Sequence, residues 1–172
     1  MRKPKTYFTI INVDVFKTGI LVIVNSSIKG ILSDLNKIFD SINIKGEDKE
    51  ADIKTITNYL DPDDNGDVTA LGHCITTGNT NDVVVIFRYD NPSQISMEVL
   101  VHEMYHATKR ICESRLVEDE ETEAYLLEHL VHTMLNKIDD YEEEKEKGIK
   151  IIKKKPTKKK NDKHPKEDKG KS

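Results

Sequence analysis

Residues 81–114, NDVVVIFRYDNPSQISMEVLVHEMYHATKRICES, contain the change of pattern on which the fold depends. The first part, residues 81–90, carries β-branched and aromatic side chains in a short apolar run, which is typical of a buried strand. The second part, residues 91–114, predicts a long helix. Ser93 is its expected N-cap, and Pro92 comes just before that cap. Because MEVLVHEMYHA is strongly apolar, we expect this helix to be buried.

The flanking segments predict further strands and helices. A helix over residues 26–42 has apolar side chains at 3.6-residue spacing and Ser26 or Ser27 as its N-cap. Strands are expected at 6–16, 19–25 and 68–77, the first two joined by a hairpin and the third joined to 81–90 at Gly78-Asn79; a shorter helix is expected near 52–60 and a second long one from about 119 to 140. This order predicts an α+β fold in which a small mixed or antiparallel sheet packs against helices.

Charge divides the chain of 172 residues into an acidic body and a basic tail. Residues 150–172 carry eleven lysines against three acidic residues, a net +8, and the overall charge of −4 then leaves −12 for residues 1–149. Such a low-complexity lysine-rich tail predicts disorder and weak polyanion contact. We expect one domain over residues 1–149, with a motif core at about 68–140.

Other features indicate a soluble cytoplasmic protein. Cys74 and Cys112 form no C-x-x-C pair and are expected to be buried, reduced thiols. No signal-peptide pattern and no run of 18 apolar residues is present, so no membrane partner is expected. The aspartate-rich residues 61–72 begin like a calcium loop but have glycine at the twelfth position, which favours an Asx-rich turn.

The segment HEMYH, residues 102–106, predicts a metal site. On a helix, His102 and His106 project from the same side, one turn apart, and can both bind one Zn²⁺. Glu103 can remove a proton from a water held by that metal. A shuffled chain of this composition would hold only about 0.02 copies of the H-E-x-x-H pattern, so chance is a poor explanation.

A catalytic zinc needs a third protein ligand, and acidic residues at 118–121 and 123 supply several candidates. The H-E-x-x-H motif followed by E-x-x-A on a second helix resembles the gluzincin, or thermolysin-like, class of zinc metallopeptidases. The resemblance covers residues 68–135 and implies a zincin-like fold with Glu121 as third ligand; Glu120 and Glu123 are the alternatives. Tyr125 stands where that class usually has Asp or Asn.

The chain therefore resembles a minimal gluzincin, like small phage-encoded peptidases. The resemblance implies that residues 71–77 form a sheet-edge strand beside the cleft, which pairs with an extended substrate. Tyr125, His132 and His73 are candidates for the transition-state donor or for contacts that orient a ligand.

We expect a zinc-dependent hydrolase acting on a peptide or protein substrate, with Glu103 as general base. Two alternatives belong to other classes. One is a catalytically inactive zincin-like protein with a binding or structural role, such as a phage virion or regulatory component. The other is a nucleic-acid accessory protein acting through the lysine tail.

Overall fold

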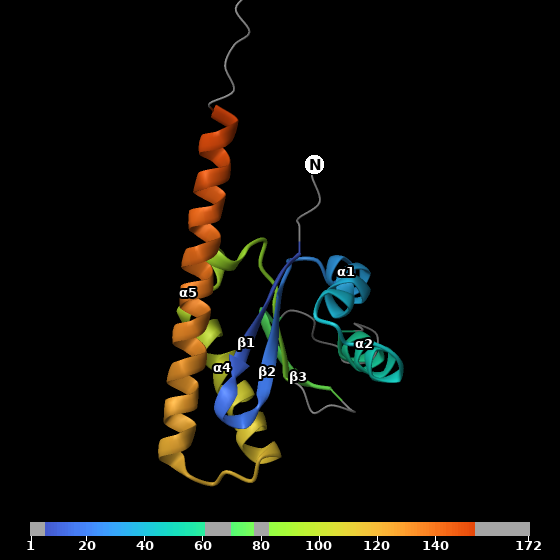
Figure 1. Cartoon of the computed structure of the whole chain (residues 1–172), viewed down its shortest axis with the longest axis vertical. Helices are drawn as coiled ribbons and strands as arrows, with labels where there is room; N and C mark the ends of the chain where they lie inside the picture. The colour runs from blue at the N-terminus through green and yellow to red at the C-terminus, as the bar shows by residue number, and fades with distance from the viewer. Residues whose placement is uncertain (1–5, 61–69, 78–82, 154–172) are drawn as a thin grey trace, which may run out of the picture.

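A mixed sheet forms the middle layer of the protein (Figure 1). The structure is a computed structural model that describes residues 6–60, 70–77 and 83–153. Within these residues the strand order is β1-β2-β4-β3, with β1 antiparallel to β2, β2 parallel to β4, and β3 antiparallel to β4. The strands are β1 (Tyr7–Val13), β2 (Thr18–Val24), β3 (Gly72–Thr76) and β4 (Val83–Phe87).

Helices cover both faces of this sheet. As Figure 1 shows, one pair lies on one side of the strands and the other pair on the opposite side. In the described part of the chain these are α1 (Ile28–Ser41) with α2 (Glu47–Leu60), and α4 (Met97–Ser114) with α5 (Glu120–Lys153). Short 3₁₀ turns at Asp14–Phe16 and Pro92–Gln94 follow β1 and precede α4.

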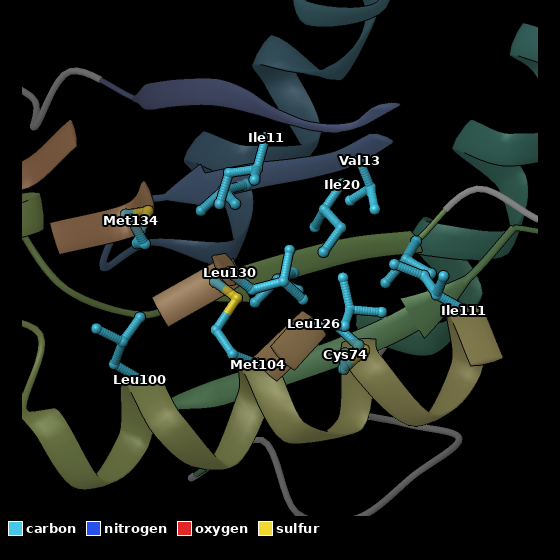
Figure 2. Packing of buried hydrophobic residues seen from close by; sticks show 14 of the residues in the cluster. Ile11, Val13, Ile20, Cys74, Leu100, Met104, Ile111, Leu126, Leu130 and Met134 are labelled. Atoms are coloured by element: carbon cyan, nitrogen blue, oxygen red, sulfur yellow. The ribbon is translucent and has the colours of Figure 1, made fainter. Parts of the chain in front are cut away.

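Two separate cores result from this layering. On β2, Val22 and Val24 face the α4–α5 side, whereas Leu21 and Ile23 face the α1–α2 side. A central strand that is buried on both faces needs apolar side chains at successive positions, which explains the continuous run in β2 and in β4. Figure 2 shows the α4–α5 core, in which the labelled residues come from both helices and the sheet: Ile11, Val13, Ile20, Cys74, Leu100, Met104, Ile111, Leu126, Leu130 and Met134.

The α+β class and the mixed sheet are confirmed, and several boundaries need correction. Ser27 caps α1 by accepting a hydrogen bond from the Gly30 amide. The predicted N-cap Ser93 is wrong: residues 92–94 form the 3₁₀ turn, and Ser96 caps α4 by accepting from the Val99 amide at 3.4 Å. A proline ring fixes its own φ near the helical value, so Pro92 opens a short turn before the helix proper.

The two C-terminal helices also differ from expectation. Helix α4 is buried on one side only, since Met97, Val101 and Tyr105 are exposed. Helix α5 continues to Lys153 instead of ending near residue 140, so it enters the segment predicted to be a disordered tail. Its 34 residues correspond to about 50 Å of helix, and Figure 1 shows that it extends well beyond the sheet.

Some predictions lie outside the described residues: most of the turn at 61–72, the Gly78-Asn79 connection and residues 154–172 of the tail. Both cysteines are free and buried, as expected. None of the helices in the described ranges is long and apolar enough to cross a membrane.

Candidate metal centre

Helix α4 brings two histidines together on its solvent side. Its buried face packs on the sheet through residues such as Leu100, Met104 and Ala107. This packing leaves His102 and His106, one turn apart, on a neighbouring face. Their Nε2 atoms are 3.0 Å apart, and the rings meet edge to face at 86°.

This spacing fits two ligands of one metal ion. Two nitrogens that each lie 2.0–2.1 Å from a tetrahedral Zn²⁺ are about 3.3 Å apart. The observed 3.0 Å is close to that separation, and it is also the length of a hydrogen bond between one protonated and one unprotonated ring nitrogen. Burial, followed by the charges of His102 and Arg110, lowers the pKa of His106 and favours the neutral ring that metals bind.

Glu103 lies against strand β3, next to Gly72. It is only 6% exposed. Burial raises the pKa of its carboxyl group, and the positive charges of His102 and Arg110 partly oppose that change. Among the described residues no cation lies within ion-pair distance of it. Glu103 is therefore a buried carboxyl group whose proton affinity is increased, which suits proton transfer.

Gly72 makes this close approach to β3 feasible. A Cβ atom at this position would lie 2.5 Å from Cγ and 2.6 Å from Oε1 of Glu103. Those distances are far below an ordinary carbon contact of about 3.5–4.0 Å. Any side chain at position 72 would have to displace the glutamate.

Helix α4 and strand β3 border a hollow of about 460 Å³, called here the α4–β3 hollow. One wall comes from α4 and the other from the start of β3, and Tyr59 of α2 also lines the hollow. The Tyr59 and His73 rings meet edge to face, with centroids 5.7 Å apart. The lining residues are Tyr59, Ala70, Gly72, His73, Cys74, His102, Glu103, His106 and Arg110. The predicted placement of residues 71–77 at a sheet edge is confirmed, because β3 is the last strand in the order.

The carboxylates at the start of α5 point in different directions. Glu121 is exposed, and its Oε1 accepts a 3.4 Å hydrogen bond from the Tyr125 hydroxyl. Glu123 instead faces α4, where both its oxygens accept from Lys109 Nζ at 2.9 and 2.7 Å. Positions two apart on a helix differ by about 200°, so one helix orientation cannot direct both residues toward α4.

No third ligand joins the histidines in the described part of the chain. There, no group of three or more His, Cys, Asp or Glu side chains is arranged to hold a metal ion. Glu120 is exposed, like Glu121. The third ligand from this acidic cluster stays a prediction.

The three candidate donors are distributed over different surfaces. His73 lines the α4–β3 hollow, and burial lowers the pKa of its ring. Tyr125 is 64% exposed and lines a second hollow, with the β1–β2 turn and His129. His132 is exposed on α5 and lines neither.

Sequence patterns did not indicate Arg110, Gly72 or Tyr59 as parts of this site. Arg110 follows His106 by four residues, so the helical spacing that identified the histidines also places it on their face. The closeness of Gly72 and Tyr59 depends on tertiary packing and has no such local signal.

Comparisons with family models, curated proteins and solved structures give no match to this chain.

Proposed function

We propose that this chain is a zinc-dependent hydrolase of peptide bonds with a zincin-like fold. The observation that carries the proposal is the convergence of His102 Nε2 and His106 Nε2 at 3.0 Å beside a buried glutamate in one hollow. Burying an unpaired carboxylate costs free energy. A histidine pair with a purely structural role would not need such a carboxyl group beside it. A hydrolase does need a proton acceptor in that place.

Each residue has a distinct task in this reaction. His102 and His106 would hold the ion, and a carboxylate from the first turn of α5 would complete the set, with Glu121 favoured by the gluzincin pattern. The metal, when bound, would activate water and polarise a carbonyl group. Glu103 would accept the proton from the attacking water and pass it to the leaving amine. Its raised proton affinity supports both transfers, because the group must gain and lose a proton in each cycle.

Strand β3 would orient the substrate. Among the described strands it lies at the edge of the sheet, and three of its residues line the hollow that contains Glu103. An extended peptide can add to such an edge through main-chain hydrogen bonds, which align its backbone independently of its sequence. This mode of binding would present one peptide bond to Glu103 and the histidine pair.

The position of Glu121 favours a second candidate function. Its carboxylate is exposed and contacts Tyr125 on its own helix. A two-histidine centre without this carboxylate fits a zincin-like protein that binds metal or partners without turnover.

Metal content and cleavage together test the proposal. The purified full chain should contain about one zinc per molecule by elemental analysis, and His106→Ala should lose it. Glu103→Gln should keep the zinc and lose cleavage of an unstructured protein such as casein. Glu121→Ala and Glu123→Ala identify the third ligand, because only the ligand variant should lose metal. Zinc binding without cleavage by the native chain would support the second function, and absence of zinc binding would reject both.

A further inference from the structure

Arg110 occupies the far end of the α4–β3 hollow. It lies on α4 one turn beyond His106 and lines the same hollow as the two histidines and Glu103. Its Nη1 donates a 2.8 Å hydrogen bond to Oγ1 of Thr76 on strand β3. Because β3 holds the guanidinium group in this way, its position relative to the histidines is fixed by two elements of the fold.

The charge of Arg110 is not neutralised by the described part of the protein. No carboxylate there lies within ion-pair distance of its guanidinium group. The neighbouring Lys109, by contrast, is paired with Glu123. A guanidinium group has five N–H donors, and the Thr76 hydroxyl accepts from only one nitrogen. As far as the structure describes the chain, Arg110 therefore retains N–H donors and forms no ion pair at the wall of the hollow.

Arg110 shares this hollow with Glu103, His106 and Cys74. An anionic group of a ligand bound there would therefore lie in the field of its positive charge.

The distance from Glu103 to Arg110 sets the position of that anionic group. Helix α4 runs along β3, with Glu103 next to Gly72 and Arg110 bonded to Thr76. Seven helical residues span about 10 Å. An extended chain covers that distance in about three residues. A peptide lying on β3 with its reacting bond at Glu103 would thus reach Arg110 about three residues further along.

We propose that Arg110 binds a carboxylate of the substrate and makes the hollow selective for peptides that are acidic about three residues from the reacting bond. The carboxylate is either the C-terminus of a short peptide or the side chain of Asp or Glu. Arginine suits this role because its planar fork can donate two parallel hydrogen bonds to one carboxylate. The assignment of the reacting bond rests on the proposed hydrolase function, whereas the anion site itself does not.

Binding of labelled peptides to the full-length Glu103→Gln protein tests this directly, by fluorescence anisotropy and without hydrolysis. Three versions of one pentapeptide separate the two sources of carboxylate: a free C-terminus, an amidated C-terminus, and an amidated peptide that ends in glutamate. We expect at least one acidic version to bind about tenfold more tightly than the neutral amide, as for one charge-assisted contact. Arg110→Gln, in the same background, should remove this difference, so that the acidic versions bind no more tightly than the neutral amide does to the same variant.

Arg115→Gln is the matched control, since Arg115 is an exposed arginine at the end of the same helix. It should leave the preference intact. Arg110→Lys should keep part of it, because the charge remains while the planar fork is lost. This second variant also covers the case in which Arg110→Gln does not fold, which thermal unfolding would reveal.

Equal affinity for all three peptides, no measurable binding of any of them, or a preference that survives in Arg110→Gln would each overturn the proposal. Failure of the hydrolase function has a different signature. In that case the metal-loaded native chain would cleave no peptide, although the acidic preference in the anisotropy measurement would persist.

Discussion

Replacing Gly72 by alanine should place a methyl group inside the space that Glu103 occupies. The added atom would lie 2.5 Å from Cγ of the glutamate, so a shift of about 1 Å is needed to reach an ordinary contact. Overpacking of this kind costs about 1–3 kcal/mol. Alanine also lowers the conformational entropy of the unfolded chain, which raises the free energy of unfolding by about 0.4–1 kcal/mol. We expect a net decrease of about 1–2 kcal/mol in the free energy of unfolding.

A double-mutant cycle attributes this cost to the contact with Glu103. In a Glu103→Ala background Cγ and the carboxyl group are absent, so Gly72→Ala should be neutral or slightly stabilising. The coupling free energy should then be about 1–2 kcal/mol, measured by urea unfolding followed by circular dichroism. Gly19→Ala is the control, because its Cβ would lie 3.3 Å from Ile10 and meet no atom of Glu103. Equal costs of Gly72→Ala in both backgrounds would refute the described packing of β3 on α4.

Three further predictions concern the core, a buried thiol and a carboxylate near the N-terminus. Leu130→Ala, which empties a fully buried position of α5, should lower the free energy of unfolding by about 2–5 kcal/mol in the same urea assay. Burial raises the pKa of Cys74 to about 12, so this thiol should stay protonated and unreactive toward iodoacetamide at pH 8 until the protein unfolds, as mass spectrometry can show. The hydroxyl of Thr6, followed by Lys37, lowers the pKa of Asp34. The stabilisation from Asp34 is therefore present above its unfolded pKa and is lost as the pH falls through its folded pKa. Over that pH range the difference in melting temperature between the native chain and Asp34→Asn should shrink.

Local patterns were sufficient to predict most elements of this fold. The spacing of apolar residues identified α1 and the runs in β2 and β4, because each pattern follows from the burial of that segment alone. The parallel pairing of β2 with β4 could not be predicted, since Val and Ile side chains suit parallel and antiparallel neighbours alike. The start of α4 was misplaced because Ser93 and Ser96 are both adequate caps, and only the turn at Pro92 decides between them.

The same distinction between local and tertiary information explains which parts of the candidate site could be predicted from the sequence. The approach of His102 to His106 is fixed by helical geometry, so four residues of spacing suffice to predict it. The contact of Glu103 with Gly72 joins two elements about thirty positions apart, and no local pattern indicates it. The histidine pair was therefore predictable, whereas the hollow that surrounds it was not.

The direction of each carboxylate at the start of α5 depends on one further quantity, the rotation of α5 about its own axis. The connection after α4 is short and places Leu116 at a φ of 54°, in the left-handed region, before α5 begins at Glu120. Burial of Leu126, Leu130 and Met134 then fixes which side of α5 faces the core. With that side fixed, Glu123 meets Lys109 of α4, and Glu121, about 200° away, meets solvent. A sequence motif specifies that a glutamate is present at the start of this helix; the core residues of α5 decide which glutamate faces α4.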